Sequence, residues 1–357
     1  MKLLERLTQT PAVPGREDRL RKLILNQIKG LFDQVQVDPL GSIIAMRKPK
    51  PTGKRTAATN RNKTSSPTRV MIAAHMDQIG FLVRHIDEKG FLRVQNVGGF
   101  DTRNLFARRV IVCPEVDDSK KDLPGVMNPS GRPVHIASED EKKKVPEIAD
   151  LVIDLGLSPA QVKRKVQIGD MVVLDVPFSR VGDTIVSQAL DNRVACWIAI
   201  RAIQKLKQHR CEIHCVFTVQ EEVGLRGAIT SAYTVKPDIG IGVDTTLCVD
   251  TPGVPDDQRV SKQGDGAAVT VMDAASIADA KLLEQFELVA RKKRIKYQRS
   301  ILPRGGTDSA GIQRAGSGVR TLTLSCPTRY IHTATEMVHR KDLDACRDLL
   351  AGYLEQA

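Results

Sequence analysis

Residues 212–233, EIHCVFTVQEEVGLRGAITSAY, predict a buried strand, a short polar turn and a helix in close succession. The apolar run before Gln220 is typical of a strand that is covered on both faces, and GLRGAITSAY is typical of a helix. Glu221 and Glu222 stand side by side where the strand ends, and the next cation along the chain is Arg226. Because adjacent carboxylates repel each other, this pair raises the question of what offsets its charge.

The same alternation of strands and helices continues through the second half of the chain. Together with RVMIAAHMD at residues 69–77, it predicts an α/β fold with a mostly parallel or mixed sheet flanked by helices. We assign residues 1–77 and 181–357 to this domain. The expected helices are 2–8, 16–32, 191–208, 224–233, 279–294 and 341–356, and the other expected strands are 34–38, 42–46, 238–244, 267–273 and 319–326.

Residues 78–180 have a different texture and predict an inserted β-rich, barrel-like domain. Short apolar segments, among them FLVRHI, FLRVQNV, RRVIVC and MVVLDV, are separated by turns rich in Gly, Pro and Asp. Within this insertion, ADLVIDLGLSPAQVKRKV at 149–166 suggests a helix, with Ser158 as a candidate N-cap. The hydrophilic residues 117–147 are expected to form loops.

The net charge of +12 raises nucleic acid as a partner, but most of the excess is local. Eight Lys or Arg residues and no acidic residue lie between Arg47 and Arg69. This segment is also rich in Pro, Thr, Ser and Asn, which favours a disordered surface loop. A solvated insertion is the preferred interpretation, and contact with RNA, an anionic surface or a protein partner is the alternative.

Other features of the sequence indicate a cytoplasmic protein that does not enter a membrane. No apolar run approaches the 18 residues of a membrane span, and the charged N-terminus lacks the apolar stretch of a secretory signal. The seven cysteines include no CxxC pair and mostly sit in apolar runs, so we expect reduced core residues. Cys211 and Cys215 fit alternating strand positions better than a zinc site.

Polar side chains gather at the predicted carboxyl ends of the strands. His75 and Asp77 follow one apolar run, Glu221 and Glu222 follow a second, and Asp244 and His332 follow two more. Asp191 precedes the helix at 191–208. Ligand sites of open α/β sheets form at the carboxyl ends of the strands, so these side chains are expected to converge on one edge of the sheet.

Two histidines and several buried carboxylates at one place are typical of a divalent metal centre. Without cations the carboxylates could not all stay ionised when buried, and His with Asp or Glu ligands suits zinc, cobalt or manganese. The set is large enough for two ions with a shared carboxylate, leaving one carboxylate as a base. Each residue alone has an ordinary explanation as a turn, a solvated loop or a helix cap, and only their combination favours the metal centre.

The sequence resembles the tetrahedral aminopeptidases, the family-forty-two metallopeptidases that include glutamyl and deblocking aminopeptidases. The resemblance covers nearly the whole chain apart from the basic segment. It rests on AAHMDQIGFLV, VGGFDTRNLFARRV, QALDNRVACW, FTVQEEVGLRGA, IGVDTTLCVDTPG, RGGTDSAGIQRAG and PTRYIHTATEMV, in the same order and spacing. It implies a dizinc aminopeptidase-like α/β domain that hydrolyses N-terminal residues from peptides.

The resemblance also implies a role for each site residue. Asp191 would bridge two ions, His75 and Asp244 would complete one ion's ligands, and Glu222 and His332 would complete the other's. Glu221 would be the general base, and Asp77 would hold the His75 ring and fix its tautomer. Zinc is the expected ion, with cobalt or manganese as alternatives. RGGTDSAG would line the site without a catalytic role, and Gln78 stands where the family usually has Glu.

The family's inserted module serves subunit contacts in a hollow tetrahedral dodecamer, so a homo-oligomer acting on peptides is expected here. Three other functions stay open at this point: an N-acyl amino-acid deacylase with the same metal chemistry, a nucleic-acid-binding protein that uses the basic segment, and an inactive scaffold. An endoglucanase is disfavoured because glycoside hydrolysis uses a carboxylate pair without metal ligands. The complete ligand set argues against the scaffold.

Overall fold

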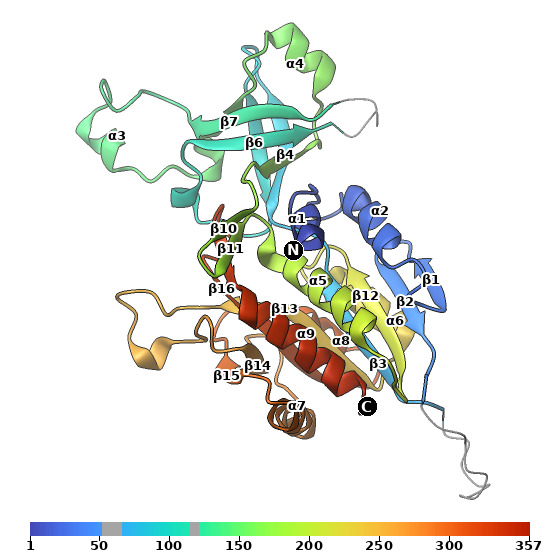
Figure 1. Ribbon diagram of the computed structural model, residues 1–357. Helices are drawn as coiled ribbons and strands as arrows, with labels where there is room; N and C mark the ends of the chain where they lie inside the picture. Colours follow the sequence, from blue (N-terminus) through green and yellow to red (C-terminus); the bar gives the residue numbers. More distant parts are fainter. Residues whose placement is uncertain (52–65, 115–120) are drawn as a thin grey trace, which may run out of the picture.

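The computed structural model describes residues 1–51, 66–114 and 121–357. In it, strand β12 (Glu212–Thr218) belongs to the parallel centre of a mixed sheet. It runs parallel to β3 (Arg69–His75), which is parallel to β13 (Ile239–Leu247), and β13 is parallel to β16 (Arg320–Arg329). The carboxyl ends of these four strands therefore meet at one edge of the sheet, below the barrel in Figure 1.

Antiparallel strands extend the sheet on both sides of this parallel centre. The order is β1-β2-β12-β3-β13-β16-β17-β11-β10, and β14 pairs with both β16 and β15. The flanking strands are β1 (Gln34–Val37), β2 (Ile43–Arg47), β10 (Ser179–Val181), β11 (Thr184–Ser187), β14 (Ala267–Met272), β15 (Tyr297–Ile301) and β17 (Glu336–His339). The predicted fold class, a mixed sheet flanked by helices with an added barrel, is confirmed.

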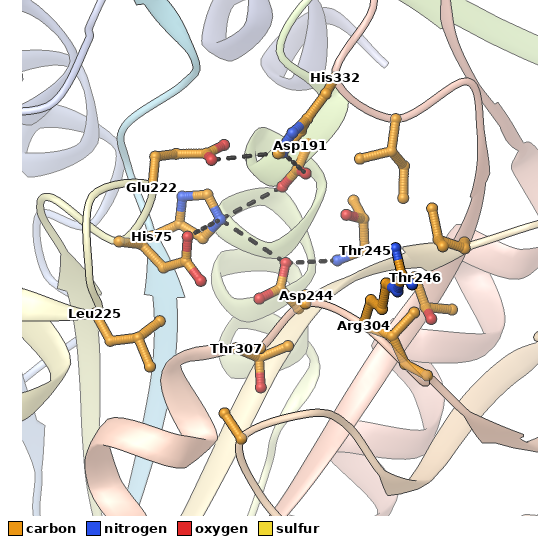
Figure 2. A pocket seen from close by; sticks show the side chains of 17 residues that line it. His75, Asp191, Glu222, Leu225, Asp244, Thr245, Thr246, Arg304, Thr307 and His332 are labelled. Carbon is orange, nitrogen blue, oxygen red and sulfur yellow. Dashed lines mark hydrogen bonds and ion pairs between the residues drawn. The ribbon is translucent and has the colours of Figure 1, made fainter. Parts of the chain in front are cut away.

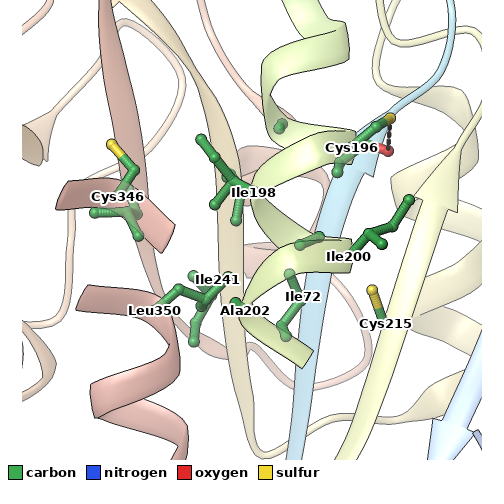
Figure 3. Close-up of a cluster of buried hydrophobic side chains, with 14 of the residues drawn as sticks. Ile72, Cys196, Ile198, Ile200, Ala202, Cys215, Ile241, Cys346 and Leu350 are labelled. Atoms are coloured by element: carbon green, nitrogen blue, oxygen red, sulfur yellow. Dashed lines mark hydrogen bonds between the residues drawn. The ribbon is translucent and has the colours of Figure 1, made fainter. Parts of the chain in front are cut away.

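Alternation along the central strands builds two hydrophobic layers. On β3, Ile72 and Ala74 belong to the larger core under α5 and α9, whereas Met71 and Ala73 face the smaller core under α6 and α8. Figure 3 shows the larger core, where helix residues such as Ile198 and Leu350 lie with strand residues. The helices are α1 (Lys2–Thr8), α2 (Asp18–Gln27), α5 (Leu190–Lys205), α6 (Arg226–Val235), α7 (Ala280–Lys293), α8 (Asp308–Gln313) and α9 (Arg340–Leu354).

A closed antiparallel barrel stands beside this sheet and encloses its own core. Its strands follow the order β4-β5-β8-β7-β6-β9. They are β4 (Gly80–Ile86), β5 (Leu92–Val97), β6 (Arg108–Cys113), β7 (Leu123–Pro129), β8 (Leu151–Asp154) and β9 (Met171–Leu174), accompanied by α3 (Glu139–Lys143) and α4 (Pro159–Lys165). Figure 1 shows α3 on an arm that projects from the barrel.

Several expected elements differ from the structure. The residues expected to be loops at 117–147 include β7 and α3, and the segment expected as a helix at 149–166 divides into β8 and α4. Ser158 caps α4 as expected, since its hydroxyl accepts the N–H of Gln161. The expected helix 16–32 spans only Asp18–Gln27, and strand β13 continues to Leu247, beyond its expected end at Asp244.

Three expectations concern the cysteines, the basic segment and membrane spans. All seven cysteines are buried and free, as expected for reduced core residues. The basic segment 47–69 falls largely on residues 52–65, which lie outside the described residues. Among the described residues, no helix is long and apolar enough to cross a membrane.

A buried arginine ties the N-terminal segment to helix α5. Arg193 is fully buried, and its guanidinium donates to the carbonyls of Leu7 (2.7 Å), Thr10 (2.9 Å) and Ala12 (3.2 Å) and to the amide oxygen of Gln78 (3.0 Å). Burial lowers the pKa of Arg193 to about 10, so the group stays charged at neutral pH. It therefore satisfies four acceptors, three of which are in buried contacts.

We predict that Arg193→Met lowers the free energy of unfolding of the ion-free protein by at least about 3 kcal/mol, because several buried acceptors lose their donor. Arg201→Met is the matched control on the same helix, since the Arg201 side chain bonds only to Gln204 at the surface. The control should stay within about 0.5 kcal/mol of wild type in urea denaturation. Equal effects of the two substitutions would contradict the role given to Arg193.

Candidate metal centre

The predicted site residues converge on one cavity of about 550 Å³ at the carboxyl edge of the sheet. They come from β3, the turn after β12, β13, the start of α5 and the turn after β16. Figure 2 shows the labelled side chains of His75, Asp191, Glu222, Asp244 and His332 pointing toward one another. The cavity is lined by His75, Asp191, Glu221, Glu222, Asp244 and His332. Its other lining residues are Leu225, 245–247, Ala275, Leu302, 304–307 and Ile331.

Asp191 lies between the two imidazoles. Its Oδ1 is 3.4 Å from His75 Nε2, and its Oδ2 is 3.4 Å from His332 Nε2. Asp244 Oδ1 lies 3.8 Å from His75 Nε2, and Glu222 Oε2 lies 3.4 Å from His332 Nε2. Three sets of potential ligand atoms lie within 4.8 Å of one another: two triads that share Asp191, and a third set formed by His75, Glu221 and Glu222.

Asp77 lies behind the cavity, where it is fully buried. Its backbone carbonyl is 3.1 Å from His75 Nδ1, while its carboxylate Oδ1 is 3.6 Å from the same nitrogen. The carboxylate oxygens instead accept the backbone N–H groups of Glu221 and Glu222, each at 3.1 Å. Asp77 therefore contacts the ring mainly through its carbonyl and holds the two glutamates through its carboxylate. A proton on Nδ1 leaves Nε2 with a lone pair that faces the cavity.

Burial and mutual repulsion shape the charges of these groups. Burial raises the pKa values of Glu221 and Asp244 well above the ordinary range, and neighbouring carboxylates add to the effect. Burial lowers the pKa of His332, but Asp191 and Glu222 outweigh this and raise it to about 11. Burial raises the pKa of Asp191, but its contacts with His332 and His75 outweigh burial and bring the pKa below the ordinary range. The site has more negative groups than imidazolium charge can offset.

One observation on this structure alone indicates that the residues fit divalent cations. Asp191 Oδ1 and Glu222 Oε1 are buried and have no hydrogen-bond partner among the described residues. Buried acceptors are normally satisfied, so these oxygens indicate a missing cation or donor in the space that they face. Carboxylate oxygens and imidazole nitrogens are the donor set that zinc, cobalt and manganese accept.

Several polar residues at the site were not singled out in the sequence. Glu336 is 2% exposed and accepts the backbone N–H groups of Asp191 and His332. Asp308 is buried, accepts the Thr218 hydroxyl at 2.5 Å, and has a pKa raised by burial to about 6. Glu336 follows His332 by four residues and Asp308 lies within RGGTDSAG, but their contacts reach across the fold. RGGTDSAG supplies part of the cavity wall, as expected.

Comparison with known proteins places the whole chain beside one family. The family model of the M42 glutamyl aminopeptidases matches residues 56–349. A putative aminopeptidase of Acetivibrio thermocellus is 36% identical, covering 98% of this chain and 96% of the relative. The structure of aminopeptidase APDkam598 from the archaeon Desulfurococcus kamchatkensis has a TM-score of 0.90 at 34% identity, covering 100% of this chain and 94% of that one.

A further solved structure concerns assembly. The TET1 peptidase of Pyrococcus horikoshii has a TM-score of 0.84 at 30% identity, and the match covers 99% of this chain and 98% of that chain. That peptidase can assemble into a tetrahedron or a large octahedral shell.

We predict that binding of Zn²⁺ or Co²⁺ to the ion-free protein releases protons. The pKa of His332, which Asp191 and Glu222 raise to about 11, means that this ligand holds a proton at neutral pH in the ion-free protein, and a cation must displace it. Apparent affinity should therefore rise as pH rises from 6 to 8. Calorimetric titration in two non-chelating buffers of different ionisation enthalpy measures the released protons. The His332→Asn variant should release fewer, and proton uptake on binding would contradict the prediction.

Proposed function

The chain belongs to the M42 glutamyl aminopeptidase family, and we propose that it removes N-terminal residues from peptides at a centre of two divalent ions. His75, Asp191 and Asp244 would hold one ion, and Asp191, Glu222 and His332 the other. The observation that carries the proposal is the position of Asp191, whose two oxygens each face a different imidazole at 3.4 Å. The family implies divalent metal, and we propose zinc as the resident ion.

The ions, when bound, would polarise the scissile carbonyl and make the attacking water more acidic. Glu221 is the general base of the proposed mechanism: its carboxylate accepts the proton of the attacking water and passes it to the leaving amine. Burial raises the pKa of Glu221 above its ordinary range, Asp244 and Glu222 add to the effect, and a raised pKa makes the carboxylate a stronger base. Asp77 holds the Glu221 N–H and so directs the carboxylate toward the cavity.

The carboxylates also explain a preference for chain ends. A free α-amine would lie against a carboxylate or a bound ion of the cavity, whereas an internal peptide bond offers no such amine. The aminopeptidase relatives favour peptide hydrolysis over N-acyl amino-acid deacylation. Assembly into a hollow homo-oligomer, as a dodecamer, is also proposed, and the likeness to the TET1 peptidase over almost the whole chain supports it.

We predict that Glu221→Gln keeps both ions but lowers kcat by about 10²–10⁴-fold, because the amide cannot accept the water proton. Aminoacyl-para-nitroanilide hydrolysis, with protein-bound zinc, cobalt or manganese measured by mass spectrometry, tests both halves of the prediction. Glu212→Gln, at the other end of β12, is the control and should keep wild-type kcat. Full activity of Glu221→Gln with two ions bound would remove Glu221 from the mechanism.

The cavity wall opposite the ligands suggests which N-terminal residue is preferred. Arg304 is exposed and is the only Lys or Arg among the described residues that line the cavity. Thr246 is 2% exposed, and its Oγ1 has no hydrogen-bond partner in the described part of the chain. Figure 2 shows these two residues on the same side of the cavity. We propose that they receive the carboxylate of an acidic N-terminal residue, and that Leu225 and Leu302 contact its methylene groups.

Arg304→Met should therefore lower kcat/KM for a glutamyl substrate by about tenfold and leave the value for a leucyl substrate within about twofold, as expected for loss of one exposed charge contact. Arg304→Glu should shift the preference toward lysyl substrates. Arg201→Met, remote from the cavity on α5, serves as the control. A uniform loss on all three substrates would argue against a contact with the substrate side chain.

A further inference from the structure

Glu336 connects two segments of the site that are far apart in sequence. Its Oε2 accepts the backbone N–H of Asp191 at 2.9 Å, and its Oε1 accepts the backbone N–H of His332 at 2.9 Å. The side chain is buried, and its contact with the Asp191 N–H is enclosed by protein, so water cannot replace that contact. One carboxylate thus fixes the spacing between two residues whose side chains face each other across 3.4 Å.

Both segments held by Glu336 have irregular backbone. Asp191 lies in a non-helical stretch at the start of α5, and His332 has a φ of +62°, in the left-handed region. A non-glycine residue in that region costs about 1 kcal/mol or more and persists only where the surrounding structure holds it. Neither position is set by a regular helix or strand, so the Glu336 contacts are needed to define both.

The position of Glu336 itself is set by a pair of strands. It is the first residue of β17, where it pairs with Ser187 of the neighbouring strand β11. β11 leads within four residues to Asp191, and β17 begins four residues after His332. The two irregular segments therefore start from one strand pair, and the carboxylate closes the gap between them.

A second buried carboxylate near the cavity makes the same pair of contacts with backbone N–H groups. Asp77 accepts the N–H groups of Glu221 and Glu222 with its two carboxylate oxygens. Together the two buried carboxylates hold the backbone of four cavity-lining residues. Neither carboxylate lines the cavity itself.

We propose that Glu336 is a positioning residue that sets the affinity of the ion assigned to Asp191, Glu222 and His332. This inference rests on the proposed two-ion function. It differs from a purely structural role because it requires an effect on one ion in particular. His332 belongs to that ion's triad alone, while Asp191 is shared, so the other ion should be affected less.

A second buried carboxylate provides a matched control. Asp342 is fully buried and accepts the backbone N–H groups of Gly264 (2.7 Å) and Gly266 (2.8 Å). It resembles Glu336 in burial and in its pair of backbone contacts, but it does not contact the site. Asp342→Asn and Glu336→Gln each replace one accepting oxygen with an NH₂ group that faces an N–H donor.

The experiment titrates ion-free wild type, Glu336→Gln and Asp342→Asn with Co²⁺ and follows the visible absorption of the bound ion, with the melting temperature measured on each protein. We expect Glu336→Gln to weaken one of two ions by about 10–100-fold, the range for residues that orient metal ligands. His332→Ala identifies that ion, because it should weaken the same one. Asp342→Asn should lower the melting temperature and keep both affinities.

If Glu336→Gln fails to fold, Glu336→Asp keeps the charge and both oxygens on a shorter stem, and the same selective loss is expected. Wild-type affinity for both ions in a folded Glu336 variant would overturn the inference. An equal loss in Asp342→Asn would also overturn it, because any buried carboxylate would then have the same effect. Failure of the proposed function has a separate signature: wild type itself would bind fewer than two ions.

Discussion

Crowding of buried carboxylates at one edge of the sheet is the constraint on which the rest of the site depends. Glu221, Glu222, Asp191 and Asp244 share one cavity, and burial opposes the ionisation of all four, although the two imidazoles bring the pKa of Asp191 below its ordinary range. Two imidazolium groups cannot offset this many carboxylates. Divalent cations remove the conflict, because each supplies two charges and several coordination positions in a small volume. In the proposed function, this repulsion is the source of metal affinity.

Behind the cavity residues, a second set of buried polar groups holds the site in place. Asp77 and Glu336 hold the backbone of the cavity residues, and Arg193 lies behind the site with its charge in the field of both carboxylates. The inserted barrel also reaches the centre: a Cβ on Gly99 would lie 3.6 Å from His332 Nδ1. A metal centre of this kind is thus supported by elements from the whole length of the chain.

Much of the arrangement could be predicted from local pattern. Buried strands followed by polar residues indicated an edge of the sheet, and His75, Asp191, Glu222, Asp244 and His332 do meet there. Other features had weak or misleading signals. Strand β7 contains Pro124, Gly125 and Pro129, which are disfavoured in strands, yet pairing with β6 and β8 holds it extended. The four residues of β8 are too few for periodicity to separate strand from helix.

By itself, the sequence determined the class of fold, the edge of the sheet that bears the site and the donor set, because these follow from hydrophobic period and residue chemistry. Only the tertiary structure decided which atoms of these residues contact one another. It set Asp191 between two imidazoles, placed the Asp77 carboxylate against the N–H groups of Glu221 and Glu222 as well as near the His75 ring, and brought Glu336 against two distant backbone amides. Such contacts join residues up to 145 positions apart. No local pattern encodes them, because they depend on where separate elements pack.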